Sequence, residues 1–492
     1  MRHFLFATFV LGLACSLADA LAAADPPRPN IIFIMSDDQG YADLGRHGNP
    51  ILKTPNLDKL YDQSVRFTDF VVSPTCSPTR TSLMTGRHEF RSGVTHTIHE
   101  RERMSLKATT YVQLLREAGY TTGIFGKWHL GDEDAYLPEK RGFEKVFIHG
   151  CGGIGQSYPG SCGDSPKNSY FHPTVWHRAP GGEGKFEATQ GYCTDVFFAA
   201  AQKWIESQKG DQPFYACITP NAPHGPLNVP PEYEAKYADK VQDKQAAKFF
   251  GMIENIDDNV GRLIELLDRK GLSKNTLVIY MNDNGGTAGV KVYNAGMRGS
   301  KVQPWWGGTR AMSLWRWPGR LGPSDVKVLC SATDLFPTLC ELAGAKVAAD
   351  VSAKLEGRNL VPLLHNLQTK WDERYLFTHV GRWQPGTPPE KYGGCSVRFN
   401  KFQLVREGKK WSLYDIASDP AEKNDLSAAK PELAAQLEKA YDAWWESVQP
   451  DLSNEDAYKT APKMNPWHVK YWKQFGGPGP NHAPVPAGLD LK

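Results

Sequence analysis

The chain has 492 residues, of which 40% are hydrophobic and 23% charged, and its formal net charge is +3. This length is enough for one large core and a second, smaller one. The nearly balanced charge, without a long basic run, excludes nucleic acid as an expected partner. Beyond the N-terminal segment no apolar run is long enough to cross a bilayer, so we expect no stable membrane span.

The N-terminus has the pattern of a targeting segment. An apolar run from Phe4 to Ala14 follows Arg2, and small residues continue up to Ala24. This order is typical of a signal peptide, here residues 1–24, and predicts export to the periplasm or out of the cell. Cys15 keeps lipoprotein anchoring open as an alternative, although Gly12 stands where a lipobox has an aliphatic residue.

The first strand is expected at Asn30 to Met35, a continuous apolar and β-branched run typical of a strand buried on both faces. It leads directly into Asp37 and Asp38. Adjacent carboxylates at the carboxyl end of a central strand are costly to bury without an ion, so a hard divalent cation is the simplest compensation. The alternative is a solvated turn.

The segment Cys76-Ser77-Pro78-Thr79-Arg80 opens a short predicted helix that ends near Gly86. We expect Cys76 just ahead of the helix N-terminus, where unpaired N–H groups and the helix dipole favour an anion. Arg80 lies one turn further on and adds positive charge. The alternative is that Cys76 is a packed small hydrophobic residue.

Three further predicted strands end in polar groups. A strand at 121–126 leads to Lys127 and His129, and one at 213–219 leads to His224 between two prolines. A histidine held in this way suits a general acid. A strand at 276–281 ends in Asp283 and Asn284, whose oxygens would complete a cation site.

The remaining pattern divides the chain. We expect a catalytic domain at 25–370, a small domain at 371–450 and an extended tail at 451–492. Further helices are predicted at 57–67, 108–120, 192–208, 244–272, 335–345 and 431–448, and a loop insertion at 149–191. Short strands are predicted at 312–317, 375–379, 396–399, 402–405 and 411–415. Asp257 and Asp258 fall within a helix and are interpreted as structural.

The cysteines give one candidate pair. Cys151 and Cys162 lie in a Gly-rich segment and are a possible disulfide. The cysteines in apolar or helical surroundings are predicted to be buried thiols: Cys193, Cys217, Cys330 and Cys340.

Taken together, the motifs resemble a type I sulfatase of the alkaline-phosphatase superfamily. The matching segments are C-S-P-T-R at 76–80, G-K-W-H-L-G at 126–131, P-H-G-P at 223–226, and R-G-S-K at 298–301 followed by W-W-G-G-T-R at 305–310. The resemblance covers about residues 30–448. It implies an α/β fold in which helices sandwich a large, mostly parallel mixed sheet, with a smaller C-terminal domain of antiparallel strands and one packed helix. Trp306 departs from the family pattern, which has Glu there.

The resemblance also implies a set of roles. A maturation enzyme would convert Cys76 to formylglycine, whose hydrate is the nucleophile. One divalent cation, Ca²⁺ or alternatively Mg²⁺, would be held by Asp37, Asp38, Cys76, Asp283 and Asn284. The implied catalytic residues are Cys76, Arg80, Lys127, His129, His224 and Lys301.

The expected reaction is hydrolysis of a sulfate ester, in a sulfated small molecule or a glycan, to alcohol and inorganic sulfate. Candidates for sugar contacts, by loop position, are Trp176, His177, Arg382 and Trp383. Two alternatives remain: a phosphatase or phosphonate monoester hydrolase of the same superfamily, and a non-catalytic glycan-binding homologue. Asp and Asn ligands favour one hard ion over a two-zinc site, which needs several histidines.

Overall fold

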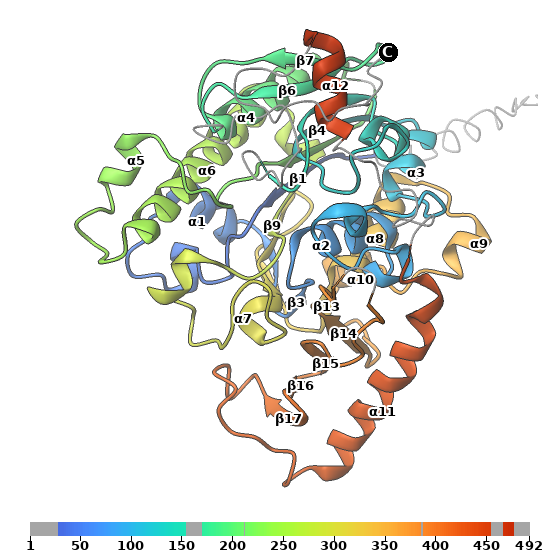
Figure 1. Cartoon of the computed structure of the whole chain (residues 1–492). Helices are drawn as coiled ribbons and strands as arrows, with labels where there is room; N and C mark the ends of the chain where they lie inside the picture. The colour runs from blue at the N-terminus through green and yellow to red at the C-terminus, as the bar shows by residue number, and fades with distance from the viewer. Residues whose placement is uncertain (1–27, 154–169, 211, 385–386, 454–465, 477–492) are drawn as a thin grey trace, which may run out of the picture.

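The computed structural model describes residues 28–153, 170–210, 212–384, 387–453 and 466–476 (Figure 1). The expected signal peptide with Cys15, and Cys162 of the candidate disulfide, lie outside these residues. Among the described residues no helix is both long and apolar enough to span a bilayer.

A ten-stranded sheet forms the centre of the molecule. Its strands are β1 (Asn30–Ser36), β2 (Val65–Phe67), β4 (Thr121–Lys127), β5 (Lys145–His149), β6 (Thr174–Arg178), β7 (Lys185–Ala188), β8 (Phe214–Thr219), β9 (Thr276–Asn282), β11 (Ser313–Arg316) and β12 (Ser324–Val326). Their order is β12-β2-β11-β9-β1-β8-β4-β5-β6-β7. The central strands β9, β1, β8, β4 and β5 pair in parallel, whereas β11, β6 and β7 pair antiparallel with their neighbours. The sheet is therefore mixed and mostly parallel, as predicted.

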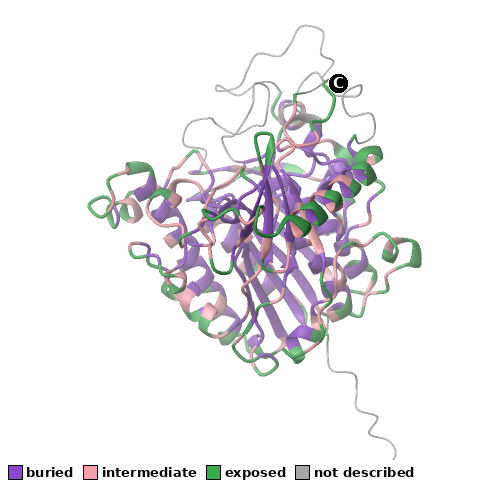
Figure 2. Ribbon diagram, turned by 90° about the horizontal axis from the view of Figure 1, so that it is seen from below, coloured by how far each residue is buried: buried purple, intermediate pink, exposed green. Residues whose placement is uncertain are grey.

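Helices cover both faces of this sheet (Figure 1). The helices of the described residues are α1 (Pro55–Asp62), α2 (Cys76–Thr85), α3 (Tyr111–Glu117), α4 (Cys193–Glu206), α5 (Pro231–Ala235), α6 (Lys244–Arg269), α7 (Trp306–Thr309), α8 (Leu335–Ala343), α9 (Ala349–Ser352), α10 (Val361–His365), α11 (Pro431–Val448) and α12 (Pro466–Phe475). Ile31 and Phe33 of β1 pack in one core with residues of α2, α3 and α8. Ile32 and Ile34 pack in a second core with α1, α4 and α6. Because β1 has apolar residues on both faces, it is fully buried, and the buried strands fill the centre of Figure 2.

Two smaller sheets lie beside the main one. Strands β3 (Phe70–Val71), β10 (Arg310–Ala311) and β13 (Cys330–Ser331) form the first, in the order β10-β3-β13. Strands β14 (Tyr375–His379), β15 (Cys395–Phe399), β16 (Phe402–Glu407) and β17 (Lys410–Asp415) form an antiparallel sheet against which α11 packs (Figure 1). This sheet and helix confirm the predicted small α+β unit, while its boundaries at 371 and 450 stay predictions.

Short 3₁₀ turns connect these elements. They are η1 (Gly45–His47), η2 (Glu89–Ser92), η3 (His99–Glu102), η4 (Asp134–Tyr136), η5 (Pro138–Lys140), η6 (Ser273–Asn275), η7 (Ala288–Lys291), η8 (Ala332–Asp334) and η9 (Gln449–Asp451).

Three local predictions need correction. The helix expected at 57–67 ends at Asp62, because Val65 and Phe67 are buried on alternating positions and pair as β2 with β11. The insertion expected as a loop at 149–191 contains the hairpin β6–β7, which extends the main sheet from β5. The tail expected to be extended contains α12, whose Trp467 is buried against Phe186 and Trp176.

The buried thiols are as expected. Cys193, Cys217, Cys330 and Cys340 are all buried and unpaired by disulfides. Asp257 is structural, since its carboxylate accepts hydrogen bonds from the backbone N–H groups of Asn56 and Leu57 at the start of α1.

Candidate active site and metal centre

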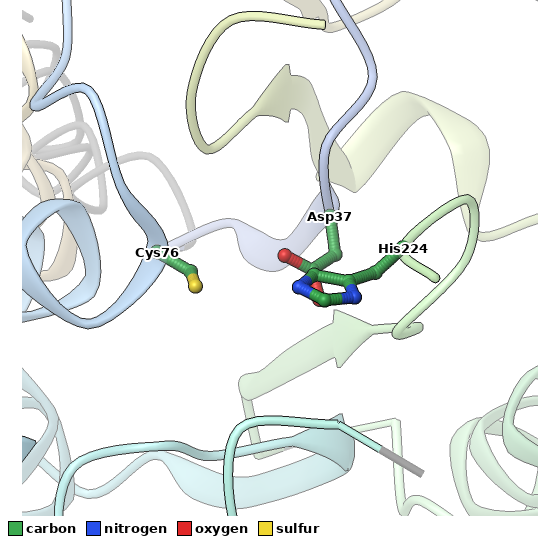
Figure 3. Close-up of side chains that lie close together, drawn as sticks. All are labelled: Asp37, Cys76 and His224. Atoms are coloured by element: carbon green, nitrogen blue, oxygen red, sulfur yellow. The ribbon is translucent and has the colours of Figure 1, made fainter. Parts of the chain in front are cut away.

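Four neighbouring parallel strands bring polar residues to one edge of the sheet. Residues 37 and 38 follow β1, residues 283 and 284 follow β9, residue 127 ends β4, and residue 224 lies in the loop after β8. Because parallel strands end at the same edge, all of these groups converge. Figure 3 shows Asp37, Cys76 and His224 with their functional atoms facing one another, all within 4.8 Å.

Three carboxylates meet at this point. Oxygen atoms of Asp37, Asp38 and Asp283 lie within 4.8 Å of one another, and these side chains are 0–2% exposed. Burial, followed by the charge of Asp37, raises the pKa of Asp283 to about 7. Within the described residues, Asp37 Oδ1 and the amide Oδ1 of Asn284 have no hydrogen-bond partner although both are buried. Convergent oxygens without donors fit a hard divalent cation such as Ca²⁺ or Mg²⁺.

Each carboxylate also has a basic partner. Lys127 Nζ lies 2.7 Å from Asp37 Oδ2, Arg80 Nη2 lies 3.0 Å from Asp283 Oδ2, and Lys301 Nζ lies 2.6 Å from Asp38 Oδ1. Burial alone would raise the pKa of Asp38, but His224 and Lys301 lower it below its ordinary value. The three cations therefore offset the mutual repulsion of the carboxylates and fix the orientation of their oxygens.

Cys76 lies at the start of α2. We expected Cys76 just ahead of the helix. Thr75 is the N-cap instead, so Cys76 is the first helical residue. The helix ends at Gly86, whose φ of 65° is left-handed as predicted for a glycine stop. All ten residues of α2 are buried, and Cys76 itself is 2% exposed. The thiol therefore faces the carboxylates and His224 from a rigid element.

His129 faces the same site in a left-handed backbone conformation, with φ of 62°. Its Nε2 lies 2.8 Å from the carbonyl oxygen of Thr97 and 3.1 Å from Glu102 Oε2. Its Nδ1 is buried without a partner among the described residues. Burial, followed by the charge of Lys127, lowers the pKa of His129 well below its ordinary value. The ring is therefore neutral at neutral pH.

His224 and Lys301 form a pair on the other side of Asp38. His224 Nδ1 donates to the carbonyl of Gly225 at 2.8 Å, so Nε2 is the acceptor for Lys301 Nζ at 2.9 Å. The pKa of His224 is lowered to about 3, mainly by burial; Asp38 acts to raise it, and Lys301 acts with burial to lower it. Burial acts against the charge of Lys301, but Asp38 reverses this and raises the pKa of Lys301. At neutral pH the proton of this pair therefore resides on Lys301.

Comparison with known proteins identifies the family. The family model described as Sulfatase matches residues 29–345, and that for the C-terminal part of N-sulphoglucosamine sulphohydrolase matches residues 308–444. The chain belongs to the type I sulfatases of the alkaline-phosphatase superfamily. It is accordingly a sulfuric ester hydrolase.

Relatives of this sulfatase agree over most of its length. Human arylsulfatase A is 31% identical over 87% of this chain and 84% of its own. Among solved structures, Ps i-CgsB in complex with k-i-k-neocarrahexaose is 28% identical, with a TM-score of 0.75 over 91% of this chain and 99% of its own. A phosphonate monoester hydrolase of Agrobacterium radiobacter shares only the fold, at 19% identity and a TM-score of 0.60 over 86% of this chain and 96% of its own.

All the predicted site residues of this sulfatase lie together, but the sequence did not predict several of their neighbours. Glu102 contacts His129, and His149, at the end of β5, is paired in register with Lys127. Burial lowers the pKa of His149 to about 3, and its Nε2 has no partner within the described part of the chain. The strand-end rule that indicated Lys127 applies equally to His149, whereas nothing in the local sequence indicates Glu102.

Trp306, the residue that departs from the family pattern, is contacted by residues from the C-terminal part of the chain. Its backbone N–H donates to Glu422 Oε2 at 3.0 Å, and Arg310 and Arg398 lie over its ring. Of the sugar-contact candidates, Trp176 is used in packing, with its ring 5.2 Å from that of Phe186.

Proposed function

We propose that this sulfatase removes sulfate from a sulfated carbohydrate by means of a formylglycine at position 76 and one divalent cation, most simply Ca²⁺. The observation that carries the proposal is the convergence of Cys76 with three buried carboxylates, at a point where Asp37 Oδ1 and the amide Oδ1 of Asn284 have no hydrogen-bond donor within the described residues. Such a cluster is stable only with compensating positive charge, and it sits directly beside the predicted nucleophile.

The cation would be held by Asp37, Asp38, Asp283, Asn284 and residue 76. When bound, it supplies electrostatic stabilisation of negative charge on the nucleophile and on a sulfate oxygen. Arg80, Lys127 and Lys301 already pair with the three carboxylates, so the residues of this chain hold the ligand oxygens in place before the ion arrives.

The Cys76 thiol stands in for the formylglycine side chain. Formylglycine, as its hydrate, would supply a hydroxyl nucleophile and a second hydroxyl whose later deprotonation releases sulfate without attack of water on sulfur. The protein contributes the position, since the side chain of residue 76 projects from the first turn of α2 toward Asp37 and His224. His129 lies on the opposite wall and orients the nucleophile through its unpartnered Nδ1.

Lys301 and His224 would protonate the leaving oxygen. An alkoxide leaving a sulfate ester at neutral pH needs a proton donor. Because His224 is neutral and Lys301 carries the proton, Lys301 is the proton source, and the bond from Lys301 Nζ to His224 Nε2 gives a route for that proton through the imidazole.

A carbohydrate substrate is supported by a relative. Ps i-CgsB, which resembles this chain over 91% of its length, was solved with k-i-k-neocarrahexaose bound. The proposal also includes a partner, the formylglycine-generating maturation enzyme. Because export is predicted, the sulfatase would act in the periplasm or in the medium.

The rival reactions have weaker support. Phosphonate monoester hydrolysis is supported only by a fold-level likeness. A non-catalytic glycan-binding homologue would have no reason to keep every basic partner of the carboxylate cluster.

Turnover of 4-nitrophenyl sulfate and of a panel of sulfated oligosaccharides tests the proposal directly. We expect both to be hydrolysed, the aryl ester at least tenfold faster than 4-nitrophenyl phenylphosphonate, and all activity to vanish in Cys76→Ala and on chelation. A preference for the phosphonate ester would favour the phosphonate hydrolase. Glycan binding that persists without metal, with no hydrolysis after the metal is added back, would favour the non-catalytic homologue.

A further inference from the structure

A segment of the small domain reaches the wall of the active site. Arg382 follows β14, and its backbone N–H donates to the carbonyl of Thr95 at 3.1 Å. Its Nη2 donates to Thr97 Oγ1 at 2.9 Å. The carbonyl of the same Thr97 lies 2.8 Å from His129 Nε2. Thr97 therefore connects Arg382 directly to a residue of the site.

The backbone at Arg382 is held in a conformation that side chains rarely adopt. Gly381 and Arg382 have φ of 67° and 65°, both left-handed. A Cβ on Gly381 would lie 2.1 Å from the carbonyl oxygen of Thr95, so only glycine permits this approach. The neighbouring Arg101 bonds to Thr95 and lies over the ring of Trp383. Strained non-glycine residues of this kind concentrate at ligand sites, which makes Arg382 a functional candidate.

Arg382 is the surplus cation of the site. Arg80, Lys127 and Lys301 each have a carboxylate partner at 3.0 Å or less. Within the described residues Arg382 forms no ion pair, and its Nε is buried without a hydrogen-bond partner. A half-buried guanidinium without a counter-charge is costly, and an anion supplied by a ligand would relieve this cost.

The charge of Arg382 interacts with groups of the site. Burial lowers its pKa, and the side chains of Cys76 and Asp38 partly offset this by raising it. The guanidinium therefore lies within the field of the nucleophile position and of a predicted metal ligand, on the side of His129 and not of Lys301.

We propose that Arg382 binds a second anionic group of the substrate, a carboxylate or a further sulfate carried beside the scissile sulfate ester. This inference rests on the proposed function and specifies the substrate class as a polyanionic sugar. Of the guanidinium N–H groups, that of Nε is buried and one on Nη2 is used by Thr97, so the terminal groups on Nη1 and Nη2 remain to match a carboxylate or sulfate. Arg382 acts here as a specificity residue that touches the substrate away from sulfur.

Two aryl sulfates of nearly equal shape test this inference: 2-carboxy-4-nitrophenyl sulfate and 2-carbamoyl-4-nitrophenyl sulfate. The measured quantity is the ratio of kcat/KM for the carboxylate to that for the carboxamide. In Arg382→Met we expect this ratio to fall about 30-fold, chiefly through KM, because one charge-assisted contact is lost. Arg382→Lys should give an intermediate ratio, since it keeps the charge without the fork.

The control is Arg406→Met, which removes the same charge from the same domain. Arg406 lies over the rings of Tyr392 and Trp411 on the small sheet. The carboxylate-to-carboxamide ratio of kcat/KM in Arg406→Met should therefore equal that of the wild type. An unchanged ratio in Arg382→Met, or equal losses on both esters, would overturn the inference. The turnover of 4-nitrophenyl sulfate by the wild type tests the proposed function separately, because this ester has no second anion.

Discussion

Lys301 Nζ lies 2.9 Å from His224 Nε2 and 2.6 Å from Asp38 Oδ1, so one ammonium connects an imidazole to a predicted metal ligand. Burial is the main reason that His224 is neutral, and the ammonium adds to it, while Asp38 keeps Lys301 protonated. The contact between Lys301 and His224 also separates the leaving-group side of the site from the nucleophile side, where His129 and Thr97 lie.

The first prediction concerns proton donation. His224→Ala should slow the hydrolysis of alkyl sulfates by about 10²–10⁴-fold, the usual contribution of a positioned acid. Aryl sulfates with acidic phenols need less protonation, so they should lose less. The check is the slope of log kcat/KM against the pKa of the leaving phenol, which should become steeper in the variant.

Tyr170→Phe is the matched control for this series. The Tyr170 hydroxyl donates to the backbone carbonyl of His224, so its loss leaves the imidazole in place. The slope of log kcat/KM against the pKa of the leaving phenol should be the same in Tyr170→Phe as in the wild type. Parallel lines for wild type and His224→Ala would show that His224 takes no part in proton transfer.

The second prediction concerns the cation. Adding Ca²⁺ to chelated protein should raise the free energy of unfolding by about 2.7 kcal/mol at a concentration 100-fold above Kd, because the ion binds only the folded site. Asp283→Asn should lose most of this gain. Asp257→Asn is the control, since Asp257 is an equally buried aspartate at the start of α1. Equal Ca²⁺-dependent shifts in thermal unfolding for both variants would place the ion elsewhere.

The third prediction concerns acid stability. His379 accepts from the N–H of Gly381 through Nδ1 at 2.8 Å and contacts the carbonyl of Glu390 through Nε2 at 2.9 Å. Burial lowers its pKa to about 4. Because the unfolded chain binds this proton more tightly, the stability is full above about pH 6.5 and is lost as the pH falls toward 4.

Urea unfolding at pH 7.5 and pH 5 measures this effect. The wild type should lose about 2 kcal/mol more than His379→Gln between these pH values. The same pH dependence in both proteins would mean that His379 is not the group responsible.

The fourth prediction concerns the backbone before Arg382. Gly381→Ala should lower the carboxylate-to-carboxamide ratio as Arg382→Met does, although the arginine is still present, because the new Cβ forces the segment away from Thr95. Gly408→Ala is the control: its φ of 58° imposes a similar backbone cost of about 1 kcal/mol, with nothing within 4 Å of the new Cβ. If the carboxylate-to-carboxamide ratio fell equally in Gly381→Ala and Gly408→Ala, general destabilisation would be the cause and the prediction would be wrong.

The sequence predicted the centre of this fold well. Strands β1, β8 and β9 are mostly apolar runs, whereas β4 has only Ile124 and Phe125 among threonines and glycines; all four lead into polar residues that lie together because the strands are parallel neighbours. Local pattern is enough for such strands because burial on both faces leaves no other arrangement. This rule predicted the convergence of Asp37 and Asp283, while the family resemblance singled out Lys127 and His224 at the ends of the other strands.

What the sequence could not show depends on long-range contacts. The strands β3, β10 and β13 have two residues each, too few for any periodicity. The helix α12 is specified by the burial of Trp467 against the hairpin β6–β7, some 280 residues earlier in the chain. The bond between Arg382 and Thr97 joins residues 285 positions apart in the chain, and neither segment carries a motif that indicates the other.

The most direct test of this account is the mass of the tryptic peptide Phe67–Arg80, taken from protein that hydrolyses 4-nitrophenyl sulfate after expression in a host with formylglycine-generating activity. The account predicts a peptide in which Cys76 has exchanged its sulfur and two hydrogens for one oxygen. An intact Cys76 thiol in fully active protein would contradict it.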